Sequence, residues 1–127
     1  MPVYQGANSC YAMNEQVYVR RIRRKGIDTL REAAAILYLI LKDYKRGWTY
    51  EQGSCRKIRM TKDLFEKRVR FVAFLAKQHG AEGEVLRAIR RLVRYVLRKK
   101  RLPRRIRVGK RNVNLQRLVD EALARKR

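Results

Sequence analysis

A run of basic side chains between residues 87 and 101, RAIRRLVRYVLRKKR, has the residue types and spacing that most clearly indicate a chemistry. At 100° per residue, Ile89, Leu92, Val93 and Val96 fall on one side of a helix. Like charges at i,i+4 destabilise a helix by a few tenths of a kcal/mol per pair, so such a face needs a compensating partner. Guanidinium groups make planar, bidentate contacts with phosphate. Phosphate binding is therefore predicted for the opposite side, which carries Arg87, Arg90, Arg91, Arg94, Arg98 and Arg101.

The basic stretch continues beyond this helix, since 13 of the 25 residues from 87 to 111 are lysine or arginine and none is acidic. A second cluster lies in VRRIRRK at 19–25, and Arg68 lies at the basic edge of another expected helix. Contacts to phosphate position a protein on nucleic acid without reading its bases. The predicted nucleic-acid-binding residues are Arg20, Arg21, Arg23, Arg24, Lys25, Arg68, Arg87, Arg90, Arg91, Arg94, Arg98, Lys99, Lys100, Arg101, Arg104, Arg105, Arg107, Lys110 and Arg111.

The whole chain shares this excess of positive charge. Its 127 residues contain 34 lysines and arginines against 11 acidic residues, a formal net charge of +23. Self-repulsion at this level destabilises a compact chain, and a polyanion relieves it. A membrane surface is the competing polyanion, but the longest apolar run, AAAILYLIL at 33–41, is too short to span a bilayer. We therefore expect a nucleic-acid partner, no membrane insertion and, without a secretion signal at the start, no export by that route.

Residue types that support catalysis or metal binding are few and scattered. His79 is the single histidine and lies near an expected helix end, where it suits bonding to helix carbonyls. Cys10 and Cys55 match no zinc spacing, and both a disulfide and two separate buried thiols remain open. Carboxylates such as Glu82 and Glu84 suit a helix start. We expect no enzyme activity, no metal, no cofactor and no small-molecule substrate.

The first 14 residues differ from the rest in charge. Residues 1–14, MPVYQGANSCYAMN, contain no charged side chain and show no clear period, so we expect an extended arm that packs on a neighbouring subunit. A helix is expected at 15–25, capped by Asn14 and closed by Gly26. A strand is the alternative for this segment, because VYV favours β structure.

The second expected helix is apolar nearly all round. Thr29 and Glu32 form a capping box at its start, it runs to Tyr44, and Gly47 follows its last turn. Such a helix is either central or buried against a partner chain. Residues 47–60 are expected to form a loop, in which the aromatic residues Trp48 and Tyr50 favour packing over stacking on bases.

Four further elements follow. A helix is expected from Thr61 or Asp63 to residue 79, another at about 84–100, a small hairpin with a Gly-Lys turn in 104–114, and a last helix after Asn114. The pattern predicts an all-α fold, a small bundle of four to five helices with an extended N-terminal arm. The expected domains are the arm at 1–14 and a basic helical DNA-binding and assembly domain at 15–127.

Two other classes of nucleic-acid-binding protein are open. Residues 72–91 resemble a helix-turn-helix, which would make the chain a sequence-specific regulator, but Glu82 and Glu84 would stand at the base-reading end of its second helix. A ribosomal protein bound to RNA is also basic and small, but the neutral arm and the apolar helix at 30–44 fit it less well. A packaging protein that wraps duplex DNA and contacts its own copies explains both the charge and the apolar segments. Full neutralisation of +23 corresponds to roughly 11–12 base pairs per copy.

The chain resembles the major capsid proteins of filamentous archaeal viruses, of the rudivirus, lipothrixvirus and tristromavirus kind, and is most similar to the small, very basic tristromavirus coat proteins. The resemblance is one of layout and charge over most of the chain. It is carried by the arm MPVYQGANSCYAMN and by the segments VRRIRRK, EAAAILYLILKDY and RAIRRLVRYVLRKKRLPRRIRVGKR. It implies a helical bundle, a virion protein assembled in the host cytoplasm, and a helical filament. In that filament, copies of the chain or of a paralogous coat subunit pair and wrap linear double-stranded DNA in A-form.

Overall fold

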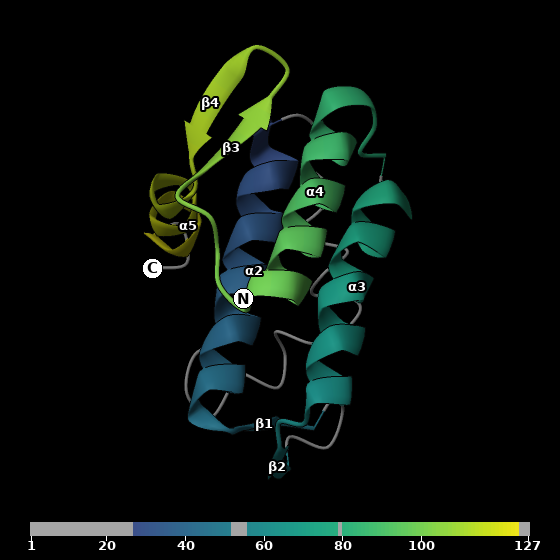
Figure 1. The fold of residues 1–127 in the computed structure, drawn as a ribbon, viewed down its shortest axis with the longest axis vertical. Helices are drawn as coiled ribbons and strands as arrows, with labels where there is room; N and C mark the ends of the chain where they lie inside the picture. The colour runs from purple at the N-terminus through teal and green to yellow at the C-terminus, as the bar shows by residue number, and fades with distance from the viewer. Residues whose placement is uncertain (1–26, 52–55, 79, 125–127) are drawn as a thin grey trace.

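The computed structural model of the chain describes residues 27–51, 56–78 and 80–124. Figure 1 shows a central helix flanked by the other helices, with one small hairpin at each end of the molecule. The described chain is thus mostly helical. In order, its elements are α2 (Ile27–Arg46), β1 (Trp48–Tyr50), β2 (Lys57–Arg59), α3 (Lys62–Gln78), α4 (Gly83–Lys99), β3 (Arg105–Val108), β4 (Arg111–Asn114) and α5 (Leu115–Ala124).

Helix α2 occupies the centre of the core and packs against α3, α4 and α5 (Figure 1). Its side chains Leu30, Leu37 and Ile40 are completely buried, as are its small residues Ala33 and Ala34. Burial of one large aliphatic side chain contributes roughly 1.5–3 kcal/mol, so α2 supplies much of the apolar stabilisation. Of the two expectations for this apolar helix, the central position within the chain is confirmed.

The start of α2 differs from the prediction, and its end agrees. The helix begins at Ile27, so Thr29 lies inside it, and in the described part of the chain the buried Thr29 hydroxyl has no hydrogen-bond partner. The expected capping box is therefore wrong. At the other end Gly47 has φ +91° and donates its N–H to the Asp43 carbonyl at 3.0 Å. A glycine ends the helix because it adopts this conformation without a side-chain clash.

The three later helices begin and end close to the predicted residues. The Thr61 hydroxyl accepts a hydrogen bond from the backbone N–H of Leu64 at 3.1 Å, which caps α3. The Asn114 side chain accepts one from the N–H of Arg117 at 3.0 Å, which caps α5. Helices α3 and α4 pack together along their lengths, with buried residues from Phe65 to Ala76 on one and from Ala88 to Val96 on the other.

Two antiparallel hairpins correct the all-α prediction. Strands β1 and β2 pair with Trp48 opposite Arg59 and Tyr50 opposite Lys57, within the segment expected to be a loop. A strand of three residues is too short to show a periodic pattern, which explains the error. The β3–β4 hairpin was predicted, and its two-residue turn places Gly109 at φ +62°, as the first position of a type II′ turn requires.

Several predictions fall outside the described residues. They concern the arm at 1–14, the helix at 15–25, and the residues Cys10, Cys55 and His79.

Candidate nucleic-acid interface

Helix α4 has the two faces that its sequence predicts. Ile89, Leu92 and Val96 are completely buried and Val93 is nearly so. The opposite face is solvent-exposed at each predicted position, namely Arg87, Arg90, Arg91, Arg94, Arg98 and, just past the helix end, Arg101. Figure 1 shows α4 in front of α2, so its outer side is not covered by another described element. The predicted arginine face is thus confirmed as an exposed surface.

Charges at the two ends of α4 suit the helix dipole. Glu84 lies in the first turn, while Arg98 and Lys99 lie in the last. The helix ends at Lys100, which has φ +59° and donates its backbone N–H to the Val96 carbonyl at 2.9 Å. Lys100 is half-buried, its Nζ bonds to the Leu97 carbonyl and lies 5.6 Å from the centre of the Phe65 ring. This lysine therefore contributes to ending the helix more than to the exposed surface.

The β3–β4 hairpin extends the basic surface beside α4. Strand β3 alternates, so Ile106 and Val108 are buried while Arg105 and Arg107 point outward. The Arg91 guanidinium on α4 donates a hydrogen bond to the Arg107 carbonyl, which joins the two elements. Twelve exposed cations lie on these two elements and the segment that joins them, and we call them together the α4–hairpin surface: Arg87, Arg90, Arg91, Arg94, Arg98, Lys99, Arg101, Arg104, Arg105, Arg107, Lys110 and Arg111.

A shallow hollow lies where the helix meets the hairpin. It is lined by Glu84, Arg87, Arg91, Arg107 and Gly109. Three guanidinium groups from two elements converge there, and the lone carboxylate leaves the hollow positive. An anionic oxygen placed in it would receive charge-assisted hydrogen bonds from several directions.

The α4–hairpin surface lacks acidic partners within the described ranges. The ion pairs among all the described residues join Glu121 to Arg31 and Arg117, Glu66 to Arg70, Asp43 to Arg46, and Glu51 to Arg56. None of these involves a cation of the α4–hairpin surface. Two of its arginines, Arg98 and Arg101, instead lie 5.8 Å from the centre of the Tyr95 ring. Among the described residues, these twelve cations thus form no ion pair with a carboxylate, and Glu84 is the acid that lines the same hollow as Arg87, Arg91 and Arg107.

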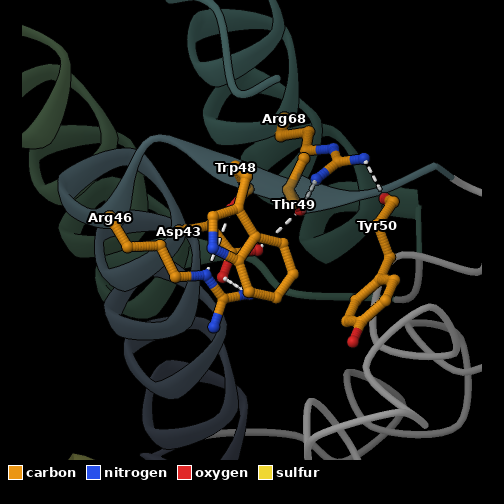
Figure 2. Close-up of polar contacts among 6 residues, drawn as sticks. All are labelled: Asp43, Arg46, Trp48, Thr49, Tyr50 and Arg68. Atoms are coloured by element: carbon orange, nitrogen blue, oxygen red, sulfur yellow. Dashed lines mark hydrogen bonds and ion pairs between the residues drawn. The ribbon is translucent and has the colours of Figure 1, made fainter. Parts of the chain in front are cut away.

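Arg68, one of the predicted phosphate-binding residues, has a different role. It is 7% exposed, and its guanidinium donates hydrogen bonds to the Thr49 hydroxyl at 2.7 Å and to the Tyr50 carbonyl at 3.0 Å (Figure 2). The prediction for Arg68 is therefore wrong. The side chain is buried, and its hydrogen bonds to Thr49 and Tyr50 connect α3 to strand β1.

Asp43 completes this buried network and was not singled out from the sequence. It is fully buried, accepts a hydrogen bond from the Thr49 hydroxyl at 2.6 Å, and lies 2.8 Å from an Arg46 nitrogen (Figure 2). Burial raises the pKa of Asp43 to about 6, against the lowering influence of Thr49, Arg46 and Arg68. The signal was present in the sequence, because an acid inside an apolar helix requires a buried partner.

Trp48 is half-buried, and two cations lie over its ring. The Arg46 guanidinium lies 3.7 Å and the Lys57 ammonium 4.1 Å from the centre of its ring. Tyr50 meets it edge-on, with ring centres 5.3 Å apart. Arg46 and Lys57 were not among the predicted site residues.

Some of the predicted contacts lie outside the described residues, and the structure bears on metal sites and membrane spans only within them. The predicted contacts Arg20, Arg21, Arg23, Arg24 and Lys25 lie outside the described ranges. Among the described residues, no group of three or more histidine, cysteine or acidic side chains is placed to hold a metal ion. Every helix within these ranges is too short or too polar to cross a bilayer.

Comparison of the chain with protein-family models, with curated proteins and with solved structures finds no match.

Proposed function

We infer that the chain is a structural nucleic-acid-packaging protein that binds double-stranded DNA through its α4–hairpin surface, without sequence preference, and assembles into a helical nucleoprotein filament. The observation that carries this proposal is the density of exposed cations without acidic partners among the described residues. Cations that repel each other are retained where an anionic polymer lies against them. The resemblance to coat proteins of filamentous archaeal viruses supports a capsid role, with copies of the chain or a paralogous subunit as partners.

The dimensions of α4 fit a duplex backbone. Seventeen residues at 1.5 Å per residue give a helix of about 25 Å. Each DNA strand presents one phosphate per 3.4 Å of axis, so this length faces about seven phosphates of one strand. The arginines recur along the whole helix and continue onto the hairpin, as tracking along a backbone requires.

A helix-turn-helix regulator is the alternative class, and the packing of α3 and α4 argues against it. The two helices of that motif cross at about 90–120°, whereas α3 and α4 run side by side and bury residues along their lengths (Figure 1). Glu82 and Glu84 are exposed at the start of α4, where a reader of bases needs donors for the groove. Strong preference for one duplex among random competitors would favour the regulator.

Charge reversal on α4 tests the proposed surface. The substitutions Arg90→Glu, Arg94→Glu and Arg98→Glu remove three exposed cations, and we expect duplex affinity to fall by at least about 100-fold at moderate salt. The slope of log K against log salt should become shallower by about three. Fluorescence anisotropy of a labelled random duplex measures both quantities.

A matched control is available on α3. Lys62, Lys67 and Lys77 are exposed there, and changing all three to glutamate alters the net charge by the same amount. If both triple variants weaken binding equally, net charge and not the assigned surface governs affinity. Competition by RNA duplex distinguishes the ribosomal alternative. Electron microscopy of the protein with long linear DNA tests assembly, for which regular filaments are expected.

A further inference from the structure

The outer face of the β1–β2 hairpin gathers aromatic and basic side chains. The register places Trp48 opposite Arg59 and Tyr50 opposite Lys57, so these four side chains share one face of the hairpin. Thr49 points to the other face and is fully buried. Arg46, from the last turn of α2, lies over the Trp48 ring. We call these five residues the Trp48 surface: Arg46, Trp48, Tyr50, Lys57 and Arg59.

Trp48 holds two of these cations in fixed positions. Arg46 lies 3.7 Å from the indole centre, donates a hydrogen bond from Nε to the Trp48 carbonyl at 3.1 Å, and pairs with Asp43 (Figure 2). Lys57 lies 4.1 Å from the same ring. Side chains already ordered in this way lose less conformational entropy when they bind an anion. The indole itself is engaged by cations, so the surface suits phosphate contacts more than base stacking.

The charges that remain around the Trp48 surface are positive. The carboxylate nearest to Arg46, that of Asp43, is fully buried, and Glu51 is paired with Arg56 at 3.1 Å. Lys57 and Arg59 are exposed, and none of the ion pairs within the described ranges includes either. A second copy of the chain is a poor match, because it carries the same net charge of +23 and several of its described acids are already buried or ion-paired, namely Glu32, Asp43, Glu51, Glu66 and Glu121. A phosphate backbone is the complementary partner.

We propose that the Trp48 surface is a second nucleic-acid contact, at which Lys57 and Arg59, with Arg46, bind backbone phosphates. This rests on the proposed function, since the same class of ligand occupies the α4–hairpin surface. The two hairpins lie at opposite ends of the molecule (Figure 1), and α2 alone spans about 30 Å. One copy thus holds the backbone at two separated places.

The protein carries its own probe for this contact. Trp48 is the single tryptophan of the chain, so its fluorescence reports on the Trp48 surface and not on α4. A random duplex of about 30 base pairs is titrated while tryptophan emission and the anisotropy of the labelled duplex are recorded. We expect a saturable, salt-sensitive change in emission, because a bound phosphate changes the charge around the cations that lie beside the indole.

Substitution of one lysine and one arginine tests the contribution of the Trp48 surface to binding. Lys57→Gln with Arg59→Gln should abolish most of the emission change and make the salt slope shallower by about two. Lys57→Arg with Arg59→Lys keeps the charges and should restore both readouts. Lys67→Gln with Lys77→Gln removes two exposed charges from α3 and should leave the emission change intact. Circular dichroism confirms that each variant is folded.

The outcomes separate this inference from the proposed function. If the duplex binds by anisotropy but Trp48 emission does not respond, or if Lys57→Gln with Arg59→Gln leaves the salt slope unchanged, the second contact is wrong and the α4–hairpin surface stands. If Arg90→Glu, Arg94→Glu and Arg98→Glu leave affinity intact while the Lys57 and Arg59 variant loses it, the Trp48 surface is the main contact and the assignment to α4 fails. If no duplex binds at all, both fail.

Discussion

At the scale of single residues, Asp43 shows how a buried charge can make stability depend on pH. Because burial raises its pKa to about 6, folded protein binds the Asp43 proton more tightly than unfolded protein does. Between the ordinary value of 3.8 and about 6, the folded state is protonated and the unfolded state is not. The contribution of Asp43 to stability is therefore greatest at acidic pH and is lost as the pH rises through about 6.

The substitution Asp43→Asn tests this pH dependence. Asparagine does not titrate and can still accept a hydrogen bond from Thr49. We expect the free energy of unfolding of the wild type, minus that of the variant, to fall by roughly 2–3 kcal/mol between about pH 4 and pH 7. Urea denaturation at several pH values measures the difference and cancels the titration of other groups. A difference that increases with pH would mean that Arg46 and Arg68 outweigh burial and lower the pKa.

Gly109 raises a second question at this scale, about backbone strain. A Cβ atom at this position would meet the carboxylate of Glu84, but that carboxylate is the end of an exposed side chain and can move. The φ of +62° cannot be relieved in this way. We expect Gly109→Ala to lower the free energy of unfolding by about 1–2 kcal/mol. We expect no recovery when Glu84→Ala is added. Recovery in the double variant would show that the clash, and not the backbone, determines the loss.

At the scale of elements, the like charges of α4 should lower the stability of the free protein while they serve the proposed binding surface. Arg94 lies four residues from both Arg90 and Arg98, so it takes part in two like-charge pairs at i,i+4. Arg94→Glu replaces both with opposite-charge pairs, and we expect the free protein to gain about 0.5–1 kcal/mol. The same change should weaken duplex binding, because it removes a cation from the α4–hairpin surface. Arg94→Gln is the control, with about half the gain in stability.

Thermal denaturation without nucleic acid and anisotropy with duplex measure the two effects. A variant with lower stability would mean that Arg94 makes a favourable contact that offsets the repulsion. Binding unchanged by Arg94→Glu would place this part of α4 outside the interface.

The elements differ in how well the sequence predicts them, for physical reasons. Helices α3, α4 and α5 have local signals in the sequence: the capping residues Thr61 and Asn114 before α3 and α5, apolar residues at helical spacing, Gly80 after α3 and Pro103 after α4. The exposed face of α4 follows from the same spacing. Strands β1 and β2 lack such signals, and β1 is held instead by side chains of two helices, Asp43 on α2 and Arg68 on α3. For the same reason the burial of Arg68 and the Trp48 surface could not be predicted.

At the scale of the whole molecule, net charge opposes folding. A formal charge of +23 on 127 residues produces repulsion that salt screens with a Debye length of about 10 Å at 0.1 M. We expect the melting temperature to rise by several degrees between low and moderate salt. A stabilisation of 1 kcal/mol corresponds to about 4–8 °C in a domain of about 60–100 residues and to about 2–4 °C in one of about 150–250 residues, and this chain of 127 residues lies between the two. A fall with salt would mean that attractive ion pairs dominate.

Duplex DNA should stabilise the protein more than salt does. A ligand present at 100 times its Kd stabilises the folded state by about 2.7 kcal/mol. Differential scanning fluorimetry at low salt, with and without a random duplex, measures the shift. The α4 triple variant should melt at nearly the same temperature with and without duplex.

The position of α5 against α2 also constrains how the molecule is made. These helices are far apart in the chain, yet they pack together and Arg31 pairs with Glu121 at 3.1 Å. During synthesis α3, α4 and the β3–β4 hairpin emerge before α5. The side of α2 that α5 covers therefore stays exposed until α5 has been made. The arginine-rich segments are consequently displayed before the core is closed. A growing polypeptide can therefore meet an anionic polymer while it is still incompletely folded.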